Sequence, residues 1–351
     1  RDDLPKNMDQ LQDVLLAIIG SGNPLNIDGI GGGDSLTNKV AILSHSDDGW
    51  ADIDYFFAQV GVNECVVDFK ATCGNIMSAV GASAIEMGLI KPQAEITEIK
   101  VKAVNTGAKI CIKTPTSKTQ KDHLCIDYIK DSKPGQGQMS GALAVSMQMM
   151  DVAGAKTNRL FPTGHKIDKI DDLEVTCLDV AVPMVIARAV DFGLSGLESK
   201  AEIDQNKAFI DHMLSIRIKA GMLMGMGDCT KSVMPKFALL TPHPKAGHII
   251  IRYFVPWQTH PSVALTGGQC LACCVLIDGT ISDNIYKKPK IYSHKASNIA
   301  KVTLHHPSGH MDVNIEYAIK NNNFIHQSSY LSQTIRKIAS GYVFIASYIW
   351  P

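Results

Sequence analysis

Two stretches of small apolar residues, 74–88 and 269–277, constrain the fold of this chain more than any other feature. The first reads GNIMSAVGASAIEMG and the second reads QCLACCVLI, and as helices both are apolar on nearly every face. A helix without a polar side has no surface to present to water, so other structure must wrap it. Runs that alternate in the manner of strands flank both stretches. We therefore predict an α+β fold in which strands surround two central apolar helices.

The turns that lead into these helices indicate an internal repeat. Thr72-Cys73-Gly74-Asn75 precedes the first helix, and Thr266-Gly267-Gly268-Gln269 precedes the second. Each turn follows a predicted strand, and each helix ends at glycine. Two copies of one unit, each a β-barrel around a central helix, would produce this pattern.

Other segments are predicted from their periodicity and end signals. We expect a helix over 8–19 that stops at Gly20, a strand over 39–44, and strands over 96–113 and 122–128. In the second half we expect strands over 173–179, 182–189, 236–240 and 248–255, helices over 199–225 and near 329–339, and a β-rich end, GYVFIASYIW.

Charge and cysteine content exclude several classes of function. The chain has 34 basic and 34 acidic residues, so no global field favours nucleic acid or an acidic membrane surface. It has no run of 18 apolar residues, and no basic-then-apolar leader opens the printed sequence. Nine irregularly spaced cysteines are typical of a reduced protein, so we expect a cytoplasmic location.

Three of the cysteines raise the question of a metal site. Cys270, Cys273 and Cys274 are close together, but no second cysteine or histidine pair follows at zinc-finger spacing. They also lie within an apolar stretch. We predict that they pack in the core and that the chain binds no metal.

Cys73 and Lys39 are the main candidates for chemistry. Cys73 stands before a buried helix, where the positive helix end and the N–H groups of Gly74 and Asn75 favour a thiolate and attract carboxylates. Lys39 ends a glycine-rich loop and opens an apolar strand, where a desolvated amine can act as a general base. A buried core cysteine and a solvated edge lysine are the alternatives that position alone leaves open.

Several other motifs are weaker. GIGGGDSLTNK does not have the residue order of a phosphate-binding loop, because serine and threonine precede the lysine. Lys231 and Lys236 flank the start of a strand, which suits an anionic substrate or a solvated surface equally. His305 and His306 precede Pro-Ser-Gly, and we interpret this segment as a tight turn between strands rather than a catalytic histidine.

Long stretches of the chain match one known family in order: SGNPLNIDGIGGGDSLTNKVAILS, DIDYFFAQVGV and CGNIMSAVGASAIEMGLI, and then LFPTG, KSVMPK, TGG, IDGT and HPSG. By these segments the chain resembles the 2-methylaconitate cis–trans isomerase family, which has the diaminopimelate-epimerase-like fold. Within the family, GGGDSLTNK and MGDCTKSVMPK are more similar to fungal aconitate isomerases than to the bacterial enzymes.

The resemblance implies two pseudo-symmetric domains with the active site in the cleft between them. We place the domains at 1–165, completed by 335–351, and at 166–334, with the last strand returning to the first domain. Lys39 and Cys73 match the family's active-site lysine and cysteine. The positions that match substrate contacts are Ser35, Thr37, Gly74, Asn75, Lys236, Thr266 and Gly267. Family members begin with a strand and a Gly-Thr-Ser loop that also faces substrate, and the printed sequence starts after it.

The implied activity is a cofactor-independent isomerisation of a small unsaturated tricarboxylate by proton removal and return. We favour cis/trans-aconitate as the substrate. The alternatives are 2-methylaconitate isomerisation, tautomerisation of an oxalomesaconate-type acid and, outside enzymes, a catalytically dead carboxylate-binding protein. A polycarboxylate is the expected partner, without nucleic acid or membrane, and a homodimer is compatible with the resemblance.

Overall fold

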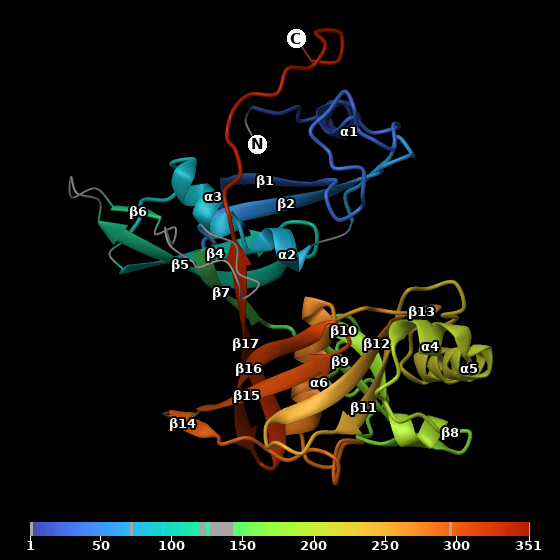
Figure 1. Ribbon diagram of the computed structural model, residues 1–351. Helices are drawn as coiled ribbons and strands as arrows, with labels where there is room; N and C mark the ends of the chain where they lie inside the picture. The colour runs from blue at the N-terminus through green and yellow to red at the C-terminus, as the bar shows by residue number, and fades with distance from the viewer. Residues whose placement is uncertain are drawn as a thin grey trace. The chain divides into compact units, whose positions relative to one another are not determined.

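The computed structural model describes residues 3–70, 73–93, 95–118, 124–126, 143–294 and 297–350. The chain forms two compact units: Arg1–Met149 with Ser332–Pro351, called unit 1 here, and Met150–Leu331, called unit 2. Both units consist mainly of β-sheet with few helices, which confirms the α+β class (Figure 1). The predicted domain bounds at 165 and 334 stay a prediction.

Unit 1 is built on a mixed sheet. Its strands are β1 (Lys39–His45), β2 (Ile53–Val60), β3 (Val67–Asp68), β4 (Glu95–Ala103), β5 (Ala108–Lys118), β6 (Leu124–Ile126) and β7 (Leu143–Met150). β1 runs antiparallel to β2, β2 parallel to β4, and β4 antiparallel to β5. The predicted strand 96–113 is thus a hairpin, because its turn reverses the chain between Ala103 and Ala108.

The first helix, α1 (Met8–Ile19), forms as predicted. The Asn7 side chain accepts hydrogen bonds from the N–H groups of Asp9 and Gln10, and Gly20 ends the helix in the left-handed conformation. Its apolar face, which includes Leu11 and Leu15, packs on residues of β1 and β2.

The predicted helix 74–88 is broken in two, α2 (Gly74–Met77) and α3 (Val80–Glu86). The Ser78 hydroxyl donates to the carbonyl of Asn75, 2.6 Å away, and the N–H of Ser78 turns to the same carbonyl. A serine that bonds the preceding turn competes with the helix ladder, so the chain tightens there instead of continuing. α3 packs against β1, β5 and β6, and a Cβ at Gly81 would lie 2.5 Å from the Thr114 hydroxyl.

Unit 2 contains the remaining strands. They are β8 (Asp168–Ile170), β9 (Leu173–Val180), β10 (Val182–Arg188), β11 (Lys236–Pro242), β12 (His248–Val255), β13 (Gln258–Thr259), β14 (Tyr292–His294), β15 (Ser297–His306), β16 (Gly309–Lys320) and the start of β17 (Asn323–Ile335). The pairs β9–β10, β11–β12, β15–β16 and β16–β17 are antiparallel, whereas β10–β11 and β12–β15 are parallel.

The central helix of unit 2 is α6 (Leu265–Leu276), and strands β9, β10, β15 and β16 all contact it. Every residue of α6 except Thr266 is buried, so the prediction of a wrapped helix is confirmed here. The predicted start was wrong, because Thr266 and Gly267 lie within the first turn rather than before it. The thiols of α6, at Cys270, Cys273 and Cys274, pack in the core as expected.

The other helices of unit 2 are the 3-10 turn η1 (Ala189–Phe192), α4 (Lys200–Gln205) and α5 (Lys207–Leu223). The single helix predicted over 199–225 was wrong, because Asn206 interrupts it. The Asn206 side chain caps a new helix by accepting from the N–H of Phe209, while Ser199 and Glu202 form a capping box on α4.

The end of the chain also differs from the prediction. Residues 323–335 form β17, paired with β16, where a helical segment near 329–339 was expected. The described residues 336–350 contain no strand, so GYVFIASYIW does not return as one. Residues from Ser332 onward nevertheless belong to unit 1, and β17 pairs with β7. Among the described helices, none is long and apolar enough to cross a membrane.

Candidate active site

The structure brings Lys39 and Cys73 together in unit 1. Lys39 opens β1 and Cys73 immediately precedes α2, and their Nζ and Sγ atoms are 3.7 Å apart. Both side chains are partly buried, and the Lys39 ammonium lies 5.8 Å from the centre of the Phe57 ring. The fully buried Tyr55 donates its hydroxyl to the carbonyl of Cys73. An amine and a thiol, both able to carry a proton, are therefore held side by side.

The glycine-rich loop ends beside Lys39. Gln59, which lies opposite Lys39 in the β1–β2 ladder, donates from its amide to the carbonyls of Ser35 and Asn38, at 3.0 and 2.9 Å. The buried Asn38 side chain in turn accepts from the N–H of Gly32. This ties the exposed Ser35 to the strand that carries Lys39. The exposed Thr37 hydroxyl donates to the carbonyl of Asp34.

Gly74 and Asn75 open α2 directly after Cys73. The first backbone bond of this turn runs from the N–H of Met77 to the carbonyl of Cys73. The N–H groups of Gly74 and Asn75 precede that bond, at the end of the helix where N–H groups lack partners within the helix. Unit 1 thus contains six of the nine predicted site residues: Ser35, Thr37, Lys39, Cys73, Gly74 and Asn75.

The other three, Lys236, Thr266 and Gly267, lie in unit 2. Lys236 opens β11, and its burial together with the charge of Arg217 lowers the pKa of its amine. Thr266 and Gly267 occupy the first turn of α6. Ala264 offers this helix no side-chain cap, so the first N–H groups are left for other acceptors.

Sequence reasoning missed two aromatic residues next to this turn, Tyr253 and His260. A Cβ on Gly267 would lie 2.6 Å from the Tyr253 ring, and the Tyr253 and His260 rings meet edge-on with centroids 5.7 Å apart. The buried Tyr253 hydroxyl has no hydrogen-bond partner in the described part of the chain, and burial raises its pKa. Burial, assisted by the charge of Lys236, lowers the pKa of His260.

A buried arginine holds the segment that leads into Lys236. Arg217 of α5 is completely buried. Its guanidinium donates to four backbone carbonyls, those of Cys229, Ser232, Met234 and Pro235, at 3.0–3.2 Å. Desolvation lowers the pKa of Arg217. The KSVMPK segment is therefore organised by an arginine outside it.

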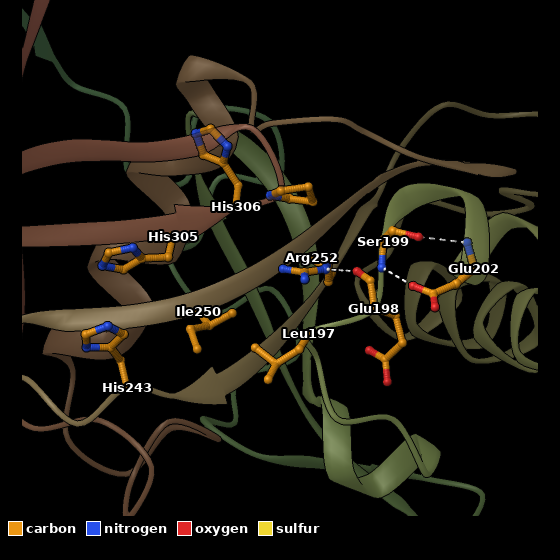
Figure 2. Close-up of a pocket in the computed structure, with 10 residues that line it drawn as sticks. Leu197, Glu198, Ser199, Glu202, His243, Ile250, Arg252, His305 and His306 are labelled. Carbon is orange, nitrogen blue, oxygen red and sulfur yellow. Dashed lines mark hydrogen bonds between the residues drawn. The ribbon is translucent and has the colours of Figure 1, made fainter. Parts of the chain in front are cut away.

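None of the nine predicted site residues lines a further pocket of unit 2. Arg252, His305 and His306 line it on one side and Glu198 and Ser199 on the other (Figure 2). The Arg252 guanidinium donates to the Glu198 carbonyl. His305 and His306 end β15 at the turn before β16, so the turn predicted for this segment is confirmed.

The family described as "PrpF protein" matches residues 1–346, nearly the whole chain. The chain belongs to the PrpF family. This confirms the resemblance to 2-methylaconitate isomerases.

Relatives and a solved structure agree with this assignment. The chain is 40% identical to YbhH of Escherichia coli (strain K12), an alignment that covers 97% of this chain and 93% of the relative. It is 35% identical to the 4-oxalomesaconate tautomerase of Pseudomonas putida, with 90% and 84% covered. The crystal structure of a methylitaconate-delta-isomerase matches with a TM-score of 0.82 at 25% identity, with 99% and 92% covered. The chain is an isomerase, and its relatives isomerise small unsaturated acids.

Proposed function

We propose that this PrpF-family isomerase interconverts cis- and trans-aconitate by proton removal and return at Lys39 and Cys73. The observation that carries the proposal is the 3.7 Å separation of the Lys39 Nζ and Cys73 Sγ atoms. Two adjacent groups that can each hold a proton suit a reaction in which one proton leaves carbon and one returns.

The chemistry needs no change in oxidation state. A base takes a proton from the carbon next to one carboxylate, and the electron pair spreads over the double bond to the other carboxylates. Return of a proton at the far carbon shifts the double bond, whereas return at the first carbon after rotation gives the geometric isomer. We propose Lys39 as the main base and acid, with Cys73 either as its partner or as a substrate contact.

Carboxylate binding is proposed for the remaining predicted residues. In unit 1 these are Ser35, Thr37, Gly74 and Asn75. In unit 2, Lys236 supplies a charge, and Thr266 and Gly267 supply N–H groups at a helix start, where anions bind favourably. Burial lowers the pKa of Lys236, and a bound carboxylate would oppose this shift by favouring the charged amine.

We also propose that the two units are related halves of a diaminopimelate-epimerase-like fold. In support, each contains a short strand followed by a helix that has glycine in its first turn, Gly74 in α2 and Gly267 in α6. In unit 1, α3 packs on β1, β5 and β6, and in unit 2, α6 packs on four strands. Superposition of the two units from a crystal structure tests this.

The rival substrates are 2-methylaconitate and an oxalomesaconate-type acid, and the name of the Pseudomonas putida relative favours the second. The deciding experiment incubates the chain with each acid separately in D₂O and follows isomer formation by NMR. Conversion of cis-aconitate at the highest kcat/KM supports the proposal. Faster conversion of another acid would reassign the substrate, and binding by calorimetry without conversion of any acid would favour the non-catalytic alternative.

The role of Lys39 is tested by substitution. We expect Lys39→Ala to lower kcat by at least ~10²-fold, the usual scale for a lost acid–base group. Lys39→Arg should be almost as damaging, because a guanidinium keeps the charge but does not release a proton at neutral pH. Lys113→Ala, which removes a partly exposed lysine of β5, is the control and should leave kcat unchanged. Near-native kcat in Lys39→Arg would move the proton transfer to another residue.

A further inference from the structure

Three histidines of unit 2 meet on neighbouring strands, and none of them is among the residues proposed for catalysis. His243 follows the end of β11, His248 opens β12, and His305 lies near the end of β15. One ring nitrogen of each lies within 4.8 Å of those of the other two. The Nδ1 atom of His248 and the Nε2 atom of His305 are only 2.8 Å apart.

The sheet register produces this cluster. Pro242 pairs with Ile249 in the antiparallel β11–β12 ladder, so the connecting loop places His243 and His248 at the same end of the strands. Ile250 pairs with His305 in the parallel β12–β15 ladder. The His243 and His305 rings stack with centroids 4.5 Å apart and planes at 1°, and Figure 2 shows both side chains at the edge of the pocket. Since strand pairing sets these positions, the backbone is already organised for the cluster.

The hydrogen bonds show where the lone pairs of the rings lie. The Nδ1 atom of His243 accepts from the N–H of Lys245, 3.1 Å away. His248 and His305 share one proton between their facing nitrogens. A neutral imidazole offers one such lone pair. A metal ion bound by these two facing nitrogens would take the place of the shared proton.

We propose that His243, His248 and His305 form a binding site for one divalent transition-metal ion, with Zn²⁺ as the best fit. Imidazole suits Zn²⁺, Ni²⁺ and Cu²⁺, and three protein ligands plus water complete a tetrahedral Zn²⁺ site. All three histidines are partly exposed, so water can reach the fourth position.

The distances are compatible with small side-chain movements. Zn–N bonds of ~2.0–2.1 Å in a tetrahedron place the nitrogens about 3.3 Å apart. The 2.8 Å distance between the facing nitrogens of His248 and His305 would lengthen slightly. The larger distances between the other pairs of ring nitrogens would shorten. Because a metal lies in the plane of each imidazole that binds it, the stacked rings of His243 and His305 must turn. Their partial exposure leaves room for this.

Charged residues near the histidine cluster determine the affinity that we expect for Zn²⁺. Lys245 is exposed on the loop between His243 and His248, and Lys301 engages Asp312 on the adjacent strands. Their positive charges weaken cation binding, and Asp312 partly offsets them. We therefore expect micromolar rather than tighter affinity for Zn²⁺.

The test uses the full chain, made without a histidine tag and freed of metal with EDTA. Calorimetry with ZnCl₂ should show one equivalent bound, and CoCl₂ should give the visible absorption of a tetrahedral site. His243→Gln and His305→Ala should each weaken Zn²⁺ binding at least about tenfold. Mutation of residues that only support metal ligands already lowers metal affinity by about 10–100-fold. The N–H signal of Lys245 should shift in NMR spectra on adding Zn²⁺.

The matched control is His310→Ala. This histidine pairs with His305 across β15 and β16, with ring centroids 6.0 Å apart, but it is outside the cluster. The His310→Ala variant should bind Zn²⁺ as tightly as the unsubstituted protein. His243→Gln changes only a loop side chain, so it keeps the test valid if His305→Ala fails to fold. Absence of stoichiometric binding, unchanged affinity in His243→Gln, or equal loss in His310→Ala would each overturn the proposal.

Discussion

Replacing Arg217 with alanine should destabilise unit 2 by about 3 kcal/mol, because it strips a buried cation from the four backbone carbonyls around it. The guanidinium is completely buried, and its bonds to Cys229 and Pro235 lie fully inside the protein. A buried carbonyl left without a partner costs roughly 1–3 kcal/mol. Those two carbonyls alone set the scale, since the other two carbonyls, in partly exposed surroundings, can be rehydrated. Removing a desolvated charge offsets part of the loss.

The assay is thermal unfolding followed by circular dichroism. For a domain of this size, 1 kcal/mol shifts Tm by about 2–4 °C, so the transition of unit 2 should fall by roughly 6–12 °C. Arg217→Met should be damaged nearly as much as Arg217→Ala, because a side chain of similar bulk cannot satisfy carbonyls. In either variant KM should rise more than kcat falls, since the segment that positions Lys236 loses its anchor.

The matched control lies two residues further along the same helix. Lys219 forms an exposed ion pair with Asp171, with side chains 49% and 47% exposed. Such surface pairs contribute little, so Lys219→Met should lower Tm by no more than about 2 °C. If Arg217→Met matched Lys219→Met in Tm, the carbonyls would not depend on the guanidinium and the reasoning would fail.

Three further outcomes are expected. Saturating substrate should protect Cys73 from alkylation, and equal labelling with and without substrate would place this thiol outside the site. Gly267→Ala should lower both stability and activity, because the new Cβ would lie 2.6 Å from the Tyr253 ring, whereas Gly341→Ala, with open space around it, should change neither. Burial lowers the pKa of His326 to about 4, so below pH ~6.5 the unfolded chain takes up a proton that the folded chain refuses. Stability should therefore fall as pH drops from about 6.5 towards 4, and urea titrations should show a shallower fall in His326→Gln; an identical pH dependence would contradict this assignment.

Local signals in the sequence predicted some elements well. Asn7 and Gly20 bracket α1 with a cap and a left-handed stop, and both act within a few residues. The apolar character of α6 required wrapping, which the strands provide. Lys39 and Cys73 were singled out by position, but their meeting depends on how β1 is placed against α2. Only the family resemblance joined them.

The errors arose where a side chain or a distant strand outweighed periodicity. Ser78 and Asn206 each end one helical segment by hydrogen bonding to the backbone, although the apolar pattern continues past them. The segment predicted as a helix near 329–339 became β17 because β16 supplies a pairing partner. Arg217, in the middle of a predicted helix, was not singled out from the sequence, since its four acceptors lie in another segment.

The histidine cluster also depends on a contact between distant segments, which local sequence patterns do not reveal. His243 and His248 are close in sequence, and a search for paired histidines across a short loop would have found them. His305 joins them only through the parallel pairing of β12 with β15. The expectation of no metal rested on cysteine spacing and did not consider this pair.

The buried cysteines of each unit can be used to measure how often that unit opens. Cys111 is buried in unit 1, whereas Cys177, Cys229 and the three thiols of α6 are buried in unit 2. A thiol reagent can reach these sulfurs only when the surrounding unit opens, so their modification rates measure how often it opens. Mass spectrometry of the labelled peptides reads the two units separately from one sample. The native cysteines can thus report, without any engineered label, whether the two units open together or one before the other.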